Sequence, residues 1–436
     1  MKPWIRCRLL LTAPVLMAAL CAVAAHGATY YVSSSQGSDS NSGLSAQMPW
    51  RTLHRVSQAV IMPGTSVLLR RGDVWHEELR PASSGTSNLP IHYSAYGKGK
   101  KPAISGSDEI APEQWSLAET GVYCLEGVTH QPTALWRRGV RLLQSRSEGD
   151  GWWYEPTFLR ACLRSAHSPD GVEVQIRAVN IDNNGQSHII YDGLDLEHAL
   201  EGLRIFLWSG TARGVTIENC LIVSEPSVAD APASAGVYVS ARAGTVSQVA
   251  IRNNEFYPYP QGLNHWGVYL VQGIDGFAIE NNRFGPAGED AITVWHSAHG
   301  VISGNRGGGN GENTIDVKDS QVVTIRDNDA ENDREYDIVV HSVDEDETRD
   351  IVVSGNRCRR GGSGGKLSAG IALLGVRRCT VRANWIAQAY GAAILMVEPT
   401  RSSGNQVGTN HFDHNGIGQD LPSVVWQYPA SGRLQP

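Results

Sequence analysis

The feature that most constrains the fold is a short motif that recurs through the second half of the chain. Each copy has an apolar residue, two variable residues and an asparagine, and successive copies are 23 to 35 residues apart. The aligned asparagines are Asn219, Asn254, Asn282, Asn305, Asn328, Asn356, Asn384 and Asn410. Such a period with short alternating segments is typical of a solenoid of strands. Helical solenoids need amphipathic runs of about 10 residues or more, which these repeats lack. We therefore predict a β-solenoid in which the asparagines stack in a structural ladder.

A second kind of segment recurs between the asparagines. The aligned copies are 236–240, 267–271, 291–295, 314–318, 337–341, 370–374 and 393–397. The second and fourth positions are apolar in every copy, so we expect them to point into the solenoid. The first, third and fifth positions are expected to point outward. Equivalent residues on adjacent coils then form columns with a spacing of about 4.8 Å.

The rest of the chain divides into three further regions. Residues 1–28 have basic residues, then an apolar run, then small residues, which is typical of a secretory signal with cleavage near Ala25 or Ala28. Residues 29–108 are expected to form the N-terminal cap and first coils, and residues 186–436 the main solenoid and C-terminal cap. Residues 109–185 lack the repeat and are rich in tryptophan and tyrosine, which predicts a small β-rich insertion.

The N-terminal region also contains a predicted capping helix. The segment PWRTLHRVSQAV has Leu53, Val56 and Val60 at helical spacing, so we expect a short amphipathic helix that covers the open end of the solenoid. Two of the cysteines, Cys124 and Cys162, form a possible disulfide pair in an exported protein.

The segment YYVSSSQGSDSNSGLSAQMPWRTLHRVSQAV, with PGTSVLLRRGDVWHEEL and LPIHYSAYGKGKKPAISG after it, resembles the N-terminal region of family 9 pectate lyases. The resemblance implies an all-β protein with a right-handed parallel β-helix, and a lyase activity that uses Ca²⁺ and a lysine base. Glu289 and Asp290 match an acidic pair of that family. Thr293 stands where a third carboxylate is expected, and Asp316 stands where the lysine is expected, with Lys318 two residues further along.

Carboxylates recur at the start of three successive strands. Glu289, Glu312 and Glu335 are 23 residues apart, and like charges at about 5 Å repel unless they are protonated or bridged by a cation. Oxygen ligands at this spacing suit Ca²⁺. We predict a calcium site formed by Glu289, Asp290, Glu312 and Asp316. The alternative is a solvated turn in which the side chains point apart.

Lys318 is the predicted catalytic base. Trp295 and His341 flank it on the neighbouring coils, and this setting is expected to lower the pKa of the lysine. Asp316 and His341 are its predicted catalytic partners, and the predicted substrate-binding residues are Trp295, His296, Asp337 and Tyr269. The alternative is a surface lysine paired with Asp316 or Asp319, with structural histidines.

These residues predict a secreted or periplasmic polysaccharide lyase that cleaves a uronate-containing glycan by β-elimination, with a cation neutralising the uronate carboxylate. One alternative is a glycoside hydrolase that pairs Asp316 with Asp290 or Asp337. Another is a non-catalytic glycan-binding β-helix. The net charge of −7 disfavours binding to nucleic acid or to an anionic membrane. We expect a monomer whose partner is an acidic polysaccharide.

Overall fold

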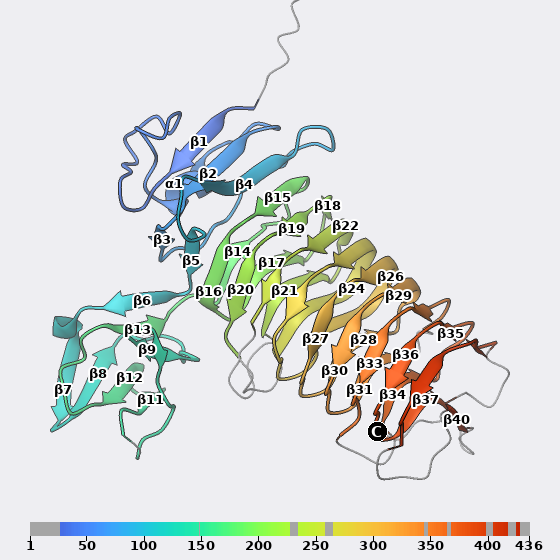
Figure 1. Ribbon diagram of the computed structural model, residues 1–436. Helices are drawn as coiled ribbons and strands as arrows, with labels where there is room; N and C mark the ends of the chain where they lie inside the picture. Colours follow the sequence, from blue (N-terminus) through green and yellow to red (C-terminus); the bar gives the residue numbers. More distant parts are fainter. Residues whose placement is uncertain are drawn as a thin grey trace, which may run out of the picture.

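The chain is wound into a long parallel β-helix with a second, smaller β-rich body at its side (Figure 1). The computed structural model describes residues 27–147, 149–226, 234–257, 265–343, 348–363, 368–397, 404–416 and 424–427. All but the last two residues of the predicted signal segment therefore lie outside the described residues. No helix in the described ranges is long and apolar enough to span a membrane.

Each coil of the β-helix has three strands separated by sharp turns, so three faces run along its axis. In one coil these strands are β28 (Asn313–Lys318), β29 (Gln321–Arg326) and β30 (Asp329–Glu331), which pair in parallel with β31 (Tyr336–His341), β32 (Val352–Ser354) and β33 (Arg357–Arg359) of the next coil. The first two faces belong to a 21-stranded sheet and the third to an 11-stranded sheet. The parallel β-helix predicted from the repeat is confirmed.

The first face carries the columns on which the sequence analysis depends. Its other strands are β14 (Val179–Asp182), β17 (Glu201–Leu207), β21 (Ser234–Ala241), the first halves of β24 (His265–Glu280) and β26 (Ile292–Ser303), β34 (Ala369–Leu374), β37 (Ala392–Val397) and β40 (Val424–Gln427). The second face adds β15 (Ile189–Asp192), β18 (Thr211–Arg213), β19 (Thr216–Glu218), β22 (Thr245–Arg252), β35 (Thr380–Arg382) and β38 (Gln406–Val407). The third adds β16 (Asp195–Ala199), β20 (Leu221–Ser224), β23 (Glu255–Phe256), β25 (Arg283–Phe284), β27 (Arg306–Gly308), β36 (Trp385–Ala387) and β39 (His411–Asp413).

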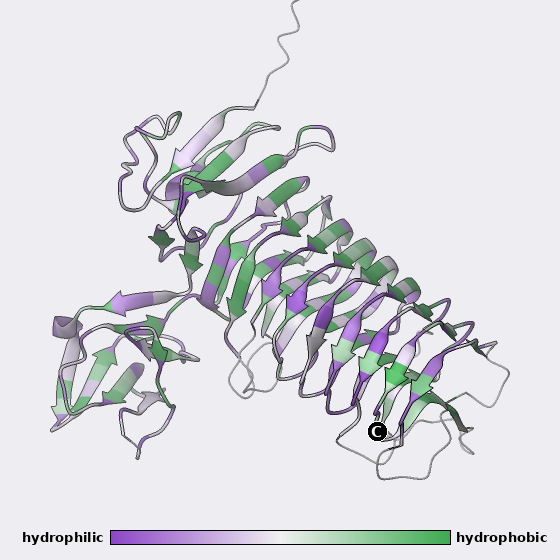
Figure 2. Cartoon of the chain, in the orientation of Figure 1, coloured by the Kyte–Doolittle hydropathy of each residue, from purple (hydrophilic) through white to green (hydrophobic). Residues whose placement is uncertain are grey.

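The predicted register is present in the structure. Asp316 lies opposite Thr293 on the preceding coil, and Lys318 lies between Trp295 and His341. Apolar residues at the second and fourth positions are fully buried, and hydrophobic and hydrophilic residues alternate along the strands (Figure 2). On the last coils, outward positions are apolar as well, and they form a separate buried cluster.

The prediction for the first position of each strand was wrong. Asp337 is fully buried, as are Thr314 and Ala291 at the same position on earlier coils. Thr314 and Asp337 are followed directly by the buried residues Ile315 and Ile338, so alternation begins only after the first position of each strand. The Thr314 hydroxyl donates to Asp333, and burial together with the nearby charge of Asp333 raises the pKa of Asp337 well above its ordinary value. Asp337 is therefore an interior residue and not a substrate-binding residue at the surface.

Stacked asparagines connect the coils at the corner between the second and third faces. The backbone N–H and the side-chain amide of Asn305 both donate to the side-chain oxygen of Asn328, at 2.9 and 3.0 Å. The same pair of bonds joins each successive asparagine from Asn254 to Asn410. The first predicted rung was wrong by one residue. Cys220 donates its N–H to Asn254, whereas the side chain of Asn219 bonds Asp192 outside the ladder.

The N-terminal coils have the predicted cap. Helix α1 (Leu53–Gln58) buries Leu53 and Val56, and Thr52 caps its first turn. Val60 lies beyond the end of the helix and is exposed, because the chain becomes extended at Ala59. The strands of this region are β1 (Thr29–Val32), β2 (Ser66–Arg70), β3 (Val74–Trp75), β4 (Ile91–Tyr96) and β5 (Ala103–Ser105).

The insertion consists of two four-stranded antiparallel sheets. They contain β6 (Ser107–Ile110), β7 (Trp115–Glu119), β8 (Val122–Glu126), β9 (Leu135–Arg137), β10 (Val140–Arg141), β11 (Trp152–Glu155), β12 (Arg160–Arg164) and β13 (Val172–Gln175). The possible pair Cys124–Cys162 is a disulfide in the structure and joins β8 to β12.

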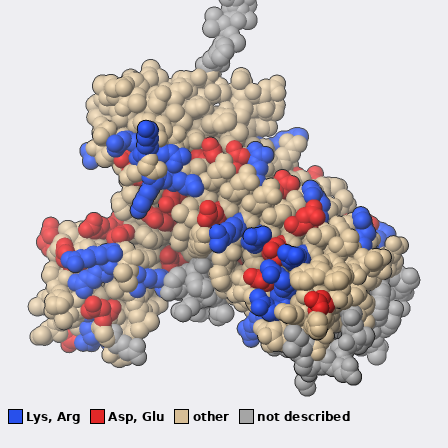
Figure 3. All heavy atoms as spheres, in the orientation of Figure 1, with Lys and Arg blue, Asp and Glu red and all other residues tan. Residues whose placement is uncertain are grey.

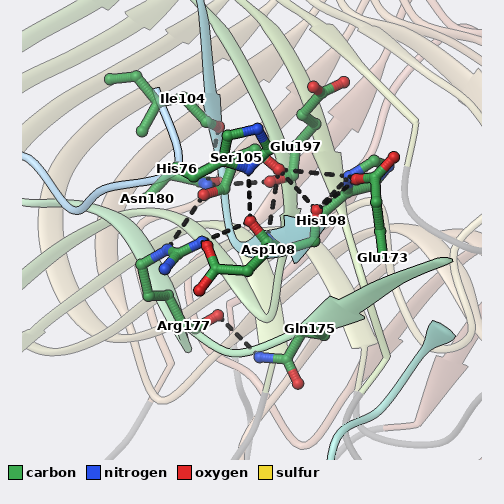
Figure 4. A network of polar contacts seen from close by, with 11 residues as sticks. His76, Ile104, Ser105, Asp108, Glu173, Gln175, Arg177, Asn180, Glu197 and His198 are labelled. Atoms are coloured by element: carbon green, nitrogen blue, oxygen red, sulfur yellow. Dashed lines mark hydrogen bonds and ion pairs between the residues drawn. The ribbon is translucent and has the colours of Figure 1, made fainter. Parts of the chain in front are cut away.

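A polar network joins the insertion to the first coils (Figure 4). The Ser107 hydroxyl contacts both Glu173 and His198, and the imidazole of His198 packs on Trp136 with the ring centroids 4.0 Å apart. Arg177 bonds the carbonyl of Ser105 and pairs with Asp108. Because these contacts come from both bodies, they hold the base of the insertion against the β-helix.

The ladder leads to a stability prediction. Asn305→Ala removes the acceptor of two bonds and leaves the buried N–H of Asn282 without a partner, so the free energy of unfolding is expected to fall by about 1–3 kcal/mol. Denaturant unfolding followed by circular dichroism measures the change. Asn88→Ala, at an exposed turn, is the control and should leave stability within about 0.5 kcal/mol. Equal losses in both variants would contradict the role of the ladder.

Candidate active site

The most polar part of the first face is centred on Asp316. Its side chain is almost fully buried and accepts a hydrogen bond from Nε2 of His341 at 2.8 Å. The Nζ atom of Lys318 lies 3.1 Å from the second carboxylate oxygen of Asp316. The lysine and histidine side chains are 20% and 24% exposed, so both reach the surface above the aspartate.

These contacts set the charges of all three groups. Burial alone would raise the pKa of Asp316, but the charges of His341 and Lys318 and their hydrogen bonds lower it below its ordinary value. Burial alone would lower the pKa values of Lys318 and His341, but Asp316 raises both above their ordinary values. The expectation of a lowered pKa for Lys318 was therefore wrong, because the ion pair outweighs burial beside the indole. The lysine is held as an ammonium ion.

Asp290 lies close to Asp316 but is part of a second ladder. One of its carboxylate oxygens accepts from the N–H and the side-chain amide of Asn313, and the other accepts from the Thr293 hydroxyl at 2.6 Å. Burial, followed by the charge of Asp316, raises the pKa of Asp290 to about 7. Thr293 thus holds Asp290 in place. The resemblance had predicted a carboxylate at the position of Thr293.

The three predicted glutamates lie on successive coils. The N–H of Glu312 donates to the carbonyl of Glu289, and the N–H of Glu335 donates to the carbonyl of Glu312. Burial, the charge of Asp290 and a side-chain hydrogen bond with Glu289 raise the pKa of Glu312 to about 8. Glu312 is half-buried, and its raised pKa favours the protonated form near neutral pH.

The four predicted calcium ligands do not form a ready site in this arrangement. Both carboxylate oxygens of Asp290 and of Asp316 bond neighbouring side chains, and Lys318 adds a positive charge beside them. Among the described residues, no group of three or more His, Cys, Asp or Glu side chains could hold a metal ion. Calcium binding stays a prediction, and we derive no reaction step from it.

Aromatic residues flank the charged centre. The ring of Trp295 lies 5.1 Å from the Lys318 ammonium, and its indole N–H donates to Asp319 at 2.9 Å. His296 stacks on the same indole. Tyr269 stacks on Trp266 with the ring centroids 4.5 Å apart. Of the predicted substrate-binding residues, Trp295, His296 and Tyr269 are thus half-buried on this face.

One aromatic neighbour, Trp266, was not predicted from the sequence, and Tyr238 was placed in its outward column but given no role. Tyr238 occupies the same column as Tyr269, and their ring centroids are 5.8 Å apart. Trp266 lies one position before the aligned strand, beside the column that contains Asp290 and Asn313. Reading one position further back along each repeat would have found it.

A small hollow lies on the third face and is separate from this centre. Arg306, Gly307, Asp329, Glu331 and Arg359 line it. Its arginines pair with Asp329 and Glu331, and Figure 3 shows acidic and basic side chains interspersed on the visible surface. We therefore assign this hollow no ligand.

Comparison with known proteins gives one matching family and one relative in sequence. Residues 246–423 match the family described as periplasmic copper-binding protein (NosD). Over 320 residues, which is 64% of the chain, the sequence is 27% identical to a lacto-N-biosidase of Bifidobacterium longum subsp. longum. The chain spans 20% of the length of that relative.

Solved structures share the fold. A GH136 lacto-N-biosidase from Eubacterium ramulus aligns with a TM-score of 0.53 and 14% identity, over 89% of this chain and 68% of that chain. XylC in complex with xylose aligns with a TM-score of 0.53 and 15% identity, over 88% and 69%. The predicted parallel β-helix is confirmed, and the chain is similar to carbohydrate-active enzymes.

The charge arrangement predicts the titration of His341. Its imidazolium is stabilised by Asp316, so NMR titration should place its pKa above the ordinary value of 6.5, and Asp316→Asn should lower it. The stability that this pair contributes is fully present below the pKa of His341 in the unfolded state. It is lost as pH rises through the higher pKa of His341 in the folded state. An unchanged His341 titration in Asp316→Asn would contradict the assignment.

Proposed function

We propose that the protein is a glycoside hydrolase in which Glu312 is the general acid and Asp316 is the ionised carboxylate. The observation that carries the proposal is the different setting of the two carboxyl groups: Asp316 contacts Lys318 and His341 at 3.1 and 2.8 Å, whereas Glu312 is half-buried beside Glu289 of the preceding coil. These settings shift their pKa values in opposite directions, to about 8 for Glu312 and below the ordinary value for Asp316. Two carboxyl groups in opposite protonation states are what glycosidic bond hydrolysis requires. The similarity to lacto-N-biosidases supports a hydrolase as well.

The proposed reaction uses each group in one role. Glu312 donates its proton to the glycosidic oxygen, and the bond between that oxygen and the anomeric carbon breaks. Asp316 stabilises the positive charge that develops on the sugar ring. Water adds its oxygen to the anomeric carbon, and its proton returns to Glu312. Lys318 and His341 act through Asp316, because they keep it ionised.

Polysaccharide lysis by β-elimination is the second candidate. The observation that favours it is that Lys318 and His341 are both held as cations and both reach the surface, where they would attract a uronate carboxylate. The raised pKa of Lys318 opposes its use as a base, since the ammonium must first lose its proton. We therefore rank this reading below hydrolysis.

We propose that the protein is exported and acts on a glycan outside the cytoplasm. The composition of residues 1–28 and the match to a family described as periplasmic support this location. We propose no copper site, because the described residues contain no suitable group of ligands.

The two candidates differ in their products. The purified protein is incubated with a chromogenic lacto-N-bioside, xylan, pectate, alginate and glycosaminoglycans. We expect new reducing ends without the ultraviolet absorbance of an unsaturated uronate. An unsaturated product would favour the lyase, and binding without any cleavage would favour a non-catalytic β-helix.

Substitution tests the assigned residues. Asp316→Asn and Glu312→Gln should each lower kcat by about 10²- to 10⁴-fold on the substrate found. Asp275→Asn changes an exposed carboxylate on β24 and should leave kcat unchanged. Full activity in either of the first two variants would remove that residue from the mechanism.

The activity should also depend on pH in a defined way. The rate should fall as pH rises through about 8, because Glu312 loses its proton, and fall on the acid side only below the ordinary aspartate value of 3.8. The residual activity of Glu312→Gln should lack the alkaline limb. An alkaline limb that persists in this variant would assign it to another group.

A further inference from the structure

Six aromatic side chains lie on or directly beside the first face, on the coils that precede Asp316. We call them the aromatic stripe: ring contacts join Trp208, which directly follows β17, to Phe206, Tyr238, Tyr269 and Trp266, and Trp295 lies on the next coil beside Lys318. Trp208 is the most exposed, with 66% of its surface accessible, and the other five are half-buried. The stripe therefore extends away from the charged centre, across β17, β21, β24 and β26.

The rings follow one another from coil to coil. Phe206 packs edge-on against Trp208 at 5.2 Å and lies 6.3 Å from Tyr238, which is 5.8 Å from Tyr269. Trp295 then lies one coil before Lys318. Since adjacent coils are about 4.8 Å apart, the stripe covers roughly 15 Å along the axis up to Trp295.

The chemistry of the stripe differs from that of the charged centre. Outward positions around Asp316 are charged and those on the last coils are aliphatic, but here they present ring faces and one guanidinium, that of Arg242 at 5.5 Å from the Trp208 ring. Partly exposed aromatic side chains on adjacent coils are costly to keep in water unless they bind a partner. Flat apolar surfaces with a polar rim suit the C–H faces of pyranose rings, whose hydroxyl groups remain in water.

We propose that the aromatic stripe binds a linear, uncharged glycan segment along the helix axis, with Trp208 as the subsite farthest from Asp316. This inference rests on the proposed function, because the stripe is continuous with the candidate active site and would direct a chain toward it. It names the substrate class as a glycan of several sugar units rather than a single terminal sugar.

Binding is tested apart from turnover. The full chain with Asp316→Asn is run on native gels that contain xylan, hydroxyethylcellulose or polygalacturonate, and its retardation gives an affinity for each. We expect retardation by a neutral glycan, weakened about 3- to 10-fold by Trp208→Ala. The matched control is Trp385→Ala on the third face, where Arg357 lies over the indole at 4.9 Å, and it should change nothing.

The outcomes separate this inference from the proposed function. Absence of retardation by every neutral glycan, equal effects of the two tryptophan variants, or stronger retardation by polygalacturonate would each overturn it. Retardation that depends on Trp208 without cleavage by the wild type would support the inference and reject the hydrolase. Cleavage by the wild type, together with unchanged retardation of Trp208→Ala, would support the hydrolase and reject the inference. Thermal unfolding of each variant confirms that a loss of binding is not a loss of fold.

Discussion

The rest of the structure depends on the hydrogen bonds between stacked asparagines. The side-chain oxygen of Asn305, for example, accepts two bonds from Asn282 on the preceding coil, while its amide donates to the oxygen of Asn328 on the next coil and to the backbone carbonyl of Ile279 on the preceding coil. Because every rung repeats this geometry, the corner of every coil occurs at the same place, and the strands that follow remain in register. The columns of outward side chains, and so the candidate active site, exist because this corner does not shift.

Because the register is fixed, the ionisation of Asp316 depends on side chains from three adjacent coils and not only on its own strand. Lys318 comes from the strand of Asp316 itself, His341 from the next coil, and Asp290 from the coil before. Their interactions push the pKa values of neighbouring carboxyl groups in opposite directions, which a single exposed strand in water cannot do. The β-helix therefore contributes to the chemistry by bringing ionisable groups together in a partly buried setting.

The repeat was sufficient to predict the columns but not the corners. Ile315 and Val317 were assigned to the interior, and Trp295, Lys318 and His341 to one column, from period-two alternation alone. Asn219 was misplaced because it lies at a turn, where alternation does not apply, and Asp337 was misplaced because it and the next residue, Ile338, are both buried at the start of β31. The sign of the pKa shift at Lys318 was wrong for another reason: it depends on a 3.1 Å contact with Asp316, which competes with burial, and sequence gives no distances.

The insertion leaves and rejoins the β-helix at almost the same point. The N–H groups of Ile176 and Arg177 both donate to the carbonyl of Gly106, and Ser107 pairs with Gln175 where β6 and β13 begin and end. Nearly 70 residues are thus added between two backbone atoms in contact, and their own disulfide and core keep them folded. In the β-helix, this body therefore takes the place of a turn between β5 and β14, outside the asparagine ladder that runs from Asn254 to Asn410.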